Sequence, residues 1–214
     1  MKMKVFSGLF LTLTLMMLTT ITRGQTPFGT LKVKNADNVY IDRTEITNLD
    51  WLEYLYYLQR EYGENSPQYL AALPDTTQTS SSNKPSLYRL PAYHSHPIVG
   101  ITCKQAADYA QWRTKAANII LEQSGKKYRF EYQLATEEVL QQAFLQQKDK
   151  SIPAQELKAV SRSAKKIVNI EGNAKEITAN GTVVTGADND KLAFETYRQP
   201  DSLTSFRCMA KTVR

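Results

Sequence analysis

The residues best suited to chemistry in this chain lie in a short stretch near its C-terminal end. Positions 169–176 read NIEGNAKE, which places asparagine, glycine and glutamate residues close together. Oxygen ligands at this density, with a glycine that permits a tight turn, are what a hard cation such as calcium requires. The same composition is typical of an ordinary turn, in which these side chains bond only to the backbone. The residues alone therefore leave a calcium site and a plain turn as alternatives.

A second candidate is the histidine pair His94 and His96, which stand just before a proline. On a strand the two rings would share one face and could bind a metal. No third ligand of a suitable type lies close in the sequence, so we expect the pair to be polar surface. If the chain were an enzyme of a new kind, His94, His96 and Glu137 would be the candidates for its acid–base chemistry.

Cys103 and Cys208 are the two cysteines of the chain. In an oxidising compartment an isolated pair most often forms one disulfide. Such a bond would close a long loop and stabilise the fold by about 4–5 kcal/mol on the chain-entropy account. A thiol-based metal or redox site is the alternative, but two thiols alone rarely hold a metal. A structural disulfide between Cys103 and Cys208 is therefore the leading interpretation.

The N-terminal segment has the pattern of a secretory signal peptide. Lys2 and Lys4 precede an apolar run over 5–21, and small residues in 22–24 offer a cleavage site before Gln25. We expect residues 1–24 to be removed, although a retained membrane anchor is the alternative. No cysteine lies near the cut, so a lipid anchor on an N-terminal cysteine is not expected.

The remaining residues, 25–214, are enough for one domain with a real core. Loss of three basic residues with the signal lowers the formal net charge from +6 to +3. The chain has no stripe of lysine and arginine interleaved with aromatic residues. Binding to nucleic acid is therefore not expected.

Local signals predict alternating helices and strands around these candidates. Thr47 or Asn48 can cap a helix whose first turn carries Asp50. Thr102 with Gln105 three residues later forms a capping-box pattern before a helix that should end near residue 123. Further helices are expected over 137–147 and 154–166. Strands or extended segments are expected over 31–41 as a hairpin, 87–93, 98–101, 128–134, 167–170, 181–186 and 206–209.

Several of these segments, in this order, resemble the formylglycine-generating enzyme (sulfatase-modifying factor) family. The matching segments are 38–48 (NVYIDRTEITN), 96–112 (HPIVGITCKQAADYAQW), 133–139 (QLATEEV), 169–177 (NIEGNAKEI) and 205–208 (SFRC). Three shorter segments, 73–76 (LPDT), 91–93 (PAY) and 112–114 (WRT), are most similar to one branch of the family. That branch contains the K- and J-type lipoproteins of gliding motility and type IX secretion in Bacteroidota.

The resemblance implies a compact α+β fold, similar to C-type lectins, with much irregular structure. It also implies a calcium site. By position, Asn169 and Glu176 match the side-chain ligands, whereas Gly172 and Ala174 match the backbone-carbonyl ligands. Two side chains and two carbonyls still need waters or further donors to reach the six or more oxygens that calcium takes.

The family's catalytic residues do not carry over to this chain. The resemblance implies that active members bind copper through a cysteine pair that follows one particular strand. In this chain, residues 183–187 (VVTGA) occupy the place of that strand. No cysteine follows until Cys208, which matches a structural cysteine whose partner would lie at Ala110. Pairing with Cys103 instead would require a shift of about 10 Å along the helix axis. We therefore expect no copper and no catalytic residues of the family type.

These observations predict a secreted, non-catalytic relative of the formylglycine-generating enzymes. We expect it to act as a binding or scaffolding component of the bacterial envelope, in the periplasm or at the outer membrane. Envelope proteins, with gliding or type IX secretion components among them, are the expected partners. The alternatives are a divergent enzyme and a lectin-like module whose calcium contacts a ligand.

Overall fold

The computed structural model describes residues 26–77, 85–147, 157–161 and 163–213. The predicted signal peptide, residues 1–24, lies outside them. Within this part of the chain, no helix has both the length and the apolar character needed to cross a membrane. The described helices are α2 (Asn48–Tyr62), α3 (Pro67–Ala71), α4 (Cys103–Gln123) and α5 (Glu137–Gln146), with short 3₁₀ helices η1 (Pro85–Arg89) and η2 (Pro91–Tyr93).

The described strands form two four-stranded sheets. The first sheet has the order β1-β2-β8-β3 and is antiparallel throughout, with β1 (Thr30–Lys32), β2 (Val39–Asp42), β3 (Arg129–Leu134) and β8 (Cys208–Val213). The second has the order β6-β5-β4-β7, with β4 (Lys175–Ile177), β5 (Thr182–Asp188), β6 (Lys191–Thr196) and β7 (Thr204–Phe206). In it, β4 and β7 run parallel, whereas β5 and β6 form an antiparallel hairpin. The predicted α+β class is therefore confirmed.

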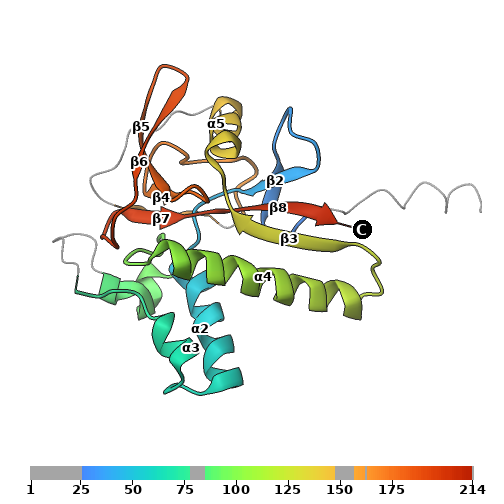
Figure 1. The fold of residues 1–214 in the computed structure, drawn as a ribbon, viewed down its shortest axis with the longest axis vertical. Coiled ribbons are helices and arrows are strands. Elements are labelled where there is room, and N and C mark those ends of the chain that lie inside the picture. Colours follow the sequence, from blue (N-terminus) through green and yellow to red (C-terminus); the bar gives the residue numbers. More distant parts are fainter. Residues whose placement is uncertain (1–25, 78–84, 148–156, 162, 214) are drawn as a thin grey trace, which may run out of the picture.

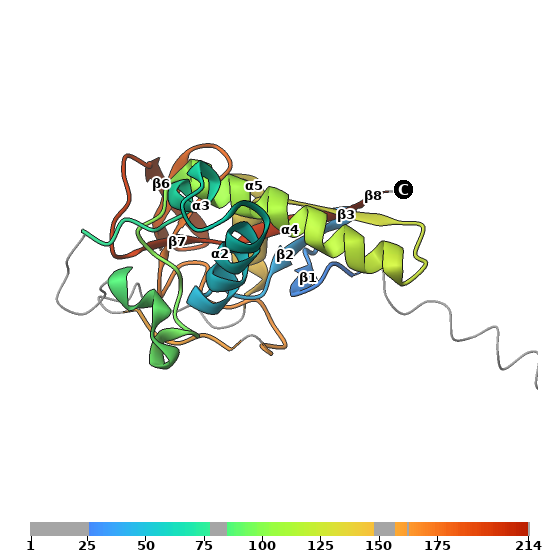
Figure 2. The ribbon, with the colours of Figure 1, turned by 90° about the horizontal axis from the view of Figure 1, so that it is seen from below.

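The first sheet separates the two main parts of the core, because successive residues of a strand point to opposite faces. On one face, α2 and α4 cover β3 and β8; Figure 2 shows both helices on this side of the sheet. On the other face lies α5 (Figure 1). The first part includes Trp51, Tyr109, Phe130, Tyr132 and Phe206, and the second includes Ile41, Leu140, Phe144, Ile170 and Met209.

The helix starts follow from capping residues and confirm the sequence predictions. Thr47 caps α2, and its side chain and that of Asp50 bond each other's backbone N–H groups. Thr102 and Gln105 do the same at the start of α4. Thr136 caps α5, and its hydroxyl accepts a hydrogen bond from the N–H of Val139. These caps fix the ends of the helices that surround the site described below.

Several predicted segments are irregular in the structure. Residues 87–93 form 3₁₀ turns rather than an extended segment, and residues 98–101 are buried but form no strand. The segment 167–170 is likewise irregular. The expected basic helix over 154–166 is wrong for its described part, which begins at Leu157. Its backbone bonds elsewhere, since the N–H of Val160 donates to the carbonyl of Ser95 at 2.7 Å.

The predicted terminal strand over 206–209 proves to be two strands that belong to different sheets. The strand β7 ends at Phe206 in the second sheet, and β8 begins at Cys208 in the first. Arg207 is the single residue between them, and its side chain is fully buried. The chain therefore crosses from one sheet to the other at the buried guanidinium of Arg207. A buried charge of this kind requires negatively charged or hydrogen-bonding groups around it.

Candidate functional site

The predicted calcium stretch forms a loop that leads into β4. Asn169 and Asn173 adopt left-handed backbone conformations, with φ of 62° and 67°. Glu176 lies on β4 and is fully buried. Its two carboxylate oxygens accept hydrogen bonds from Arg207, from Nη2 to Oε1 and from Nε to Oε2, the second at 2.7 Å. Glu176 is therefore the counter-ion of the guanidinium that joins the two sheets.

Arg207 also donates hydrogen bonds to two other segments. Its Nη1 donates to the carbonyl of Asp42 at 3.1 Å, and its Nη2 donates to the carbonyl of Val168 at 3.0 Å. The carboxylate of Glu45 lies 4.0 Å from Nη2, and both of these side chains are fully buried. One guanidinium thus faces two carboxylates, and it ties the end of β2 to the loop before β4.

Glu45 is a residue of this cluster that the sequence did not single out. Its Oε1 accepts hydrogen bonds from Asn173 Nδ2 at 2.9 Å and from the N–H of Ala174 at 3.4 Å. Its Oε2 has no hydrogen-bond partner in the described part of the chain. Burial raises the pKa of Glu45, against the opposing effects of Arg207 and Asn173. Burial likewise raises the pKa of Glu176 to about 7, although the charge of Arg207 lowers it.

In this arrangement the predicted calcium ligand Glu176 is also the partner of Arg207. Calcium would need a carboxylate oxygen of Glu176, and both of these oxygens are bonded to Arg207. Gly172 and Ala174 are buried in the loop, and Asn169 is half-buried. Calcium binding by Asn169, Gly172, Ala174 and Glu176 stays a prediction, in which the Glu176 carboxylate would bind the ion and Arg207 together.

The two cysteines are free thiols in this structure, and no disulfide joins them. Cys208 is fully buried, and burial, with the charge of Asp42, raises its pKa to about 12. Cys208 interacts electrostatically with Arg113 on α4, whereas Cys103 is the first residue of that helix. Ten residues of helix span about 15 Å. Cys208 is therefore placed beside the middle of α4, whereas Cys103 lies at its first turn.

The residues of the alternative enzyme do not come together. His94 and His96 lie beside the start of α2, where their carbonyls accept from the N–H groups of Leu49 and Asn48. Glu137 lies at the start of α5, and its carboxylate accepts from the hydroxyl of Thr182. Among the described residues, no three His, Cys, Asp or Glu side chains are placed to hold a metal ion.

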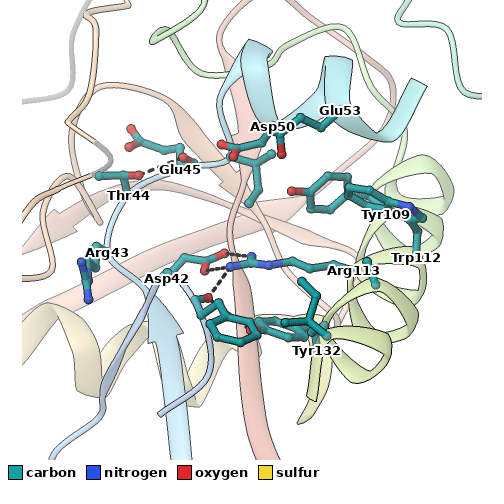
Figure 3. A pocket seen from close by; sticks show the side chains of 16 residues that line it. Asp42, Arg43, Thr44, Glu45, Asp50, Glu53, Tyr109, Trp112, Arg113 and Tyr132 are labelled. Atoms are coloured by element: carbon teal, nitrogen blue, oxygen red, sulfur yellow. Dashed lines mark hydrogen bonds and ion pairs between the residues drawn. The ribbon is translucent and has the colours of Figure 1, made fainter. Parts of the chain in front are cut away.

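A partly open cavity of about 350 Å³ lies between α4 and the segment that joins β2 to α2. Figure 3 shows Asp42 and Arg113 paired at its centre. Arg113 Nη1 and Nη2 donate to the two carboxylate oxygens of Asp42 at 2.7 and 2.8 Å, and Nη2 also donates to the carbonyl of Phe28 at 2.8 Å. The guanidinium lies 4.3 Å from the centre of the Tyr132 ring. The floor of the cavity is therefore formed by the Asp42–Arg113 ion pair, with the guanidinium lying over the face of the Tyr132 ring.

Gly29 allows the chain to pass close to this ion pair. Its φ is +78°, and a Cβ at this position would lie 2.9 Å from Arg113 Nη2. A larger residue would meet both the backbone strain and the contact. Asp42 also accepts from the N–H of Cys208 at 2.8 Å, so the floor of the cavity is joined to the start of β8.

Tyr109 belongs to the aromatic core of α2 and α4 and lines the cavity. It is 3% exposed and stacks on Trp51, with 5.5 Å between ring centres. Figure 3 shows its hydroxyl directed into the cavity, between Asp50 and the Asp42–Arg113 pair. Burial raises the pKa of Tyr109 well above its ordinary value, so the hydroxyl keeps its proton.

Comparison with known proteins places the chain in a family. Residues 15–189 match the family described as the sulfatase-modifying factor enzyme 1-like domain. No protein with a curated description matches the chain. The matched range contains α2, α4, α5 and the loop before β4, and the sheets are completed by β6, β7 and β8 beyond it. The chain therefore belongs to the sulfatase-modifying factor enzyme 1-like family.

Proposed function

We propose that this chain is a non-catalytic member of its family and acts as a binding component of the bacterial cell envelope. The placement of its two thiols carries the proposal. A copper site of the family type needs thiolates close together. Cys208 is fully buried with a pKa of about 12, and Cys103 is the first residue of α4, ten residues before the Arg113 with which Cys208 interacts. This donor set does not fit copper.

The strand that matches the family's catalytic strand supports the same conclusion. Its residues 183–187 lie within β5, which pairs with β4 on one side and with β6 on the other. The segment carries valine, threonine, glycine and alanine side chains, none of which activates oxygen. The hairpin of β5 and β6 extends away from β4 and β7 (Figure 1). The catalytic chemistry of the family therefore has no counterpart in this strand.

The binding role is supported by what the chain retains. The buried cluster around Arg207 and the aromatic core hold a cavity whose floor is a fixed ion pair. Fixed polar groups within a mostly apolar wall are typical of ligand sites. Export by the predicted signal peptide and association with gliding or type IX secretion proteins belong to the same proposal. They are supported by residues 1–24 and by the segments 73–76, 91–93 and 112–114.

The test is an oxidation assay on a Cys-x-Pro-x-Arg peptide with the full chain, copper and oxygen. We expect the peptide mass to remain unchanged, whereas an active member of the family assayed in parallel converts the cysteine to formylglycine. Conversion by this chain would overturn the proposal. Conversion that disappears in Cys103→Ser would in addition identify the thiol responsible.

A further inference from the structure

We propose that a second, lysine-rich surface cavity beside β1 binds a phosphate-bearing ligand. This cavity is partly open, has a volume of about 500 Å³ and lies between β1, the end of α5 and residues 165–167. Small-molecule sites in proteins have volumes of about 300–1,000 Å³, so a ligand of that size fits here. The inference goes beyond the proposed function, because the lining shares no residue with the ion cluster or with the cavity in Figure 3.

The charged side chains that line this cavity, which we call the lysine cavity, are all positive. They are Lys32, Lys34, Lys165 and Lys166, and no acidic residue is among the described residues that line it. Within the described part of the chain, the side chains of Lys32, Lys34 and Lys165 form no ion pair. Asp37, in the turn between β1 and β2, is exposed and does not line the cavity. A concentration of one sign of charge in a hollow attracts an anion.

The neighbouring segments that lie outside the described residues do not change this balance by their composition. Residues 148–156 and 162 contain three basic residues and two acidic ones, which gives a net charge of +1. The basic residues are Lys148, Lys150 and Arg162, and the acidic residues are Asp149 and Glu156. The sequence around the lysine cavity is therefore basic as a whole.

Gln146 holds the backbone of two of these lysines. Its Oε1 accepts from the N–H of Lys34 at 2.8 Å, and its Nε2 donates to the carbonyl of Lys32 at 3.2 Å. These bonds fix the outer edge of β1, which is an edge strand of the first sheet. Lys32 and Lys34 are exposed and Val33 between them is fully buried, so both lysine side chains project to the same side.

The other two lysines stand on a segment that is anchored just beyond them. Ile167 is 3% exposed and belongs to the part of the core that contains α5. The N–H of Val168 donates to the carbonyl of Arg43 at 3.0 Å. Leu31 packs against the same part of the core and, like Ile167, lines the lysine cavity. The lysines thus project from backbone that is already fixed, which lowers the cost of ordering the site around a ligand.

A phosphate group suits this lining better than a carboxylate does. Lysine ammonium groups only donate hydrogen bonds, and each is a compact charge on a flexible stem. A phosphate monoester carries a charge of about −1.5 to −2 at pH 7 and has three acceptor oxygens, so it can bond several lysines at once. A carboxylate offers one charge and two oxygens. The phosphate has two sources, a free phosphate compound and the head group of a phospholipid.

The experiment is a calorimetric titration of the full chain with pyrophosphate in a phosphate-free buffer. Acetate at the same ionic strength is the control anion. We expect pyrophosphate to bind at one site and acetate not to bind. The affinity for pyrophosphate should fall as sodium chloride is raised, because salt screens exposed charges. Acetate that binds as tightly as pyrophosphate would overturn the inference.

Two double variants of equal net charge locate the binding. Lys34→Gln/Lys165→Gln removes one lysine from each side of the cavity, and we expect affinity to fall about 5- to 30-fold, the worth of two exposed ion pairs. Lys115→Gln/Lys126→Gln removes two exposed charges from α4 and the turn after it, outside the cavity, and should leave affinity unchanged. An equal fall in both variants, or none in Lys34→Gln/Lys165→Gln, would place the anion elsewhere and overturn the inference.

Vesicles separate the two sources of phosphate. Co-sedimentation with phosphatidylglycerol vesicles that is absent with uncharged phosphatidylcholine vesicles, and is lost in Lys34→Gln/Lys165→Gln, would identify a lipid head group. Binding of pyrophosphate without co-sedimentation would identify a free phosphate compound, and both results support the ligand class. Wild-type protein that binds neither pyrophosphate at millimolar concentration nor phosphatidylglycerol vesicles would overturn the inference. These outcomes are distinct from the test of the proposed function, which fails only if the chain oxidises the cysteine peptide.

Discussion

Cys103 and Cys208 differ in burial, and this difference predicts their reactivity. Burial raises the pKa of both thiols, to about 12 for the fully buried Cys208. Because the thiolate is the nucleophile, Cys208 should resist iodoacetamide in the folded protein. Cys103 is half-buried and should be labelled slowly at pH 8. Intact mass spectrometry should therefore show one added label, and none in Cys103→Ser.

The same labelling decides between free thiols and the disulfide expected from the sequence. We expect two labels after unfolding in urea without a reductant, because both thiols are free in the structure. Unfolded protein that takes up no label until a reductant is added would contain the Cys103–Cys208 bond. That bond would bring the start of β8 to the first turn of α4.

Glu176 faces competing demands from calcium and from Arg207. A guanidinium with two bonds to a buried carboxylate is costly to displace, since removing one partner of a buried pair costs about 3–5 kcal/mol. The predicted calcium site therefore requires the unfolding midpoint to rise between EDTA and millimolar calcium, and the rise to be lost in Glu176→Gln. An unchanged midpoint in calcium would contradict the predicted site. Calorimetry on the same two proteins would confirm direct binding.

At the scale of residues, the sequence identifies one member of the ion cluster formed by Arg207, Glu176 and Glu45. The stretch 169–176 was singled out for its oxygen atoms, and Glu176 is indeed a central residue. Arg207 and Glu45 were missed, because they lie 31 and 131 residues away in the chain and only the fold brings them together. Both occur in segments that resemble family motifs, TEITN and SFRC. The resemblance of these two segments to family motifs indicates that they matter. It does not indicate that Glu45 and Arg207 contact Glu176.

At the scale of elements, α4 protects the outer edge of β3. Asn118 on α4 accepts from the N–H of Phe130 at 2.8 Å and donates to its carbonyl at 2.9 Å. Thr114 bonds the N–H and carbonyl of Tyr132 in the same way, at 2.8 and 3.2 Å. A helix thus supplies the hydrogen bonds that a neighbouring strand would provide, and the edge is closed to other chains.

This contact predicts the effect of Asn118→Ala. The change leaves the N–H and carbonyl of Phe130, which is 1% exposed, without their partners. Each unpaired buried polar group costs about 1–3 kcal/mol, so we expect the free energy of unfolding in urea to fall by at least that amount. Asn65→Ala, at an exposed position, is the matched control and should stay within about 0.5 kcal/mol of the wild type. An equal loss in both variants would contradict the role of Asn118.

Helix starts were predictable because their signals are local. Thr47, Thr102 and Thr136 act within three residues of themselves, and the structure has helices at each. The segment after Leu157 was not predictable, since its composition favours a helix but its backbone bonds remote segments. The N–H of Lys158, for example, donates to Asn173 Oδ1 at 2.7 Å. Tertiary bonds of this kind override helix propensity.

At the scale of the whole molecule, the ion cluster joins the two sheets. Glu176 belongs to the second sheet, the carbonyl of Asp42 to the first, and Arg207 to the crossing between them. The parallel pairing of β4 with β7 brings this crossing next to Glu176. The α+β class followed from the order of predicted elements, but the pairing of the sheets did not. Strand pairing depends on contacts between residues far apart in the chain. Such contacts leave no periodic pattern in a single sequence from which they could be predicted.

The cluster predicts an unusual dependence of stability on pH. Arg207 compensates one of its two buried carboxylates, and burial raises the pKa of both, to about 7 for Glu176. In the unfolded chain these groups titrate near 4.5. Between these values the folded state therefore binds more protons than the unfolded state. The cluster's contribution to stability is fully present below about pH 4.5 and is lost as the pH rises through about 7.

We therefore expect the urea midpoint, measured in EDTA, to be higher at pH 5.5 than at pH 7.5. Glu45→Gln is the sharpest variant, because Glu45 Oε1 accepts two hydrogen bonds and Oε2 accepts none. The amide keeps the acceptor and replaces the unpartnered oxygen by a neutral donor, as protonation would. This variant should match or exceed the wild type at pH 7.5 and vary less between the two pH values. Glu131→Gln, an exposed change on β3, should retain the wild-type dependence. A wild-type midpoint that rises with pH, or a Glu45→Gln protein much less stable at pH 7.5, would show that both carboxylates are ionised in the folded cluster.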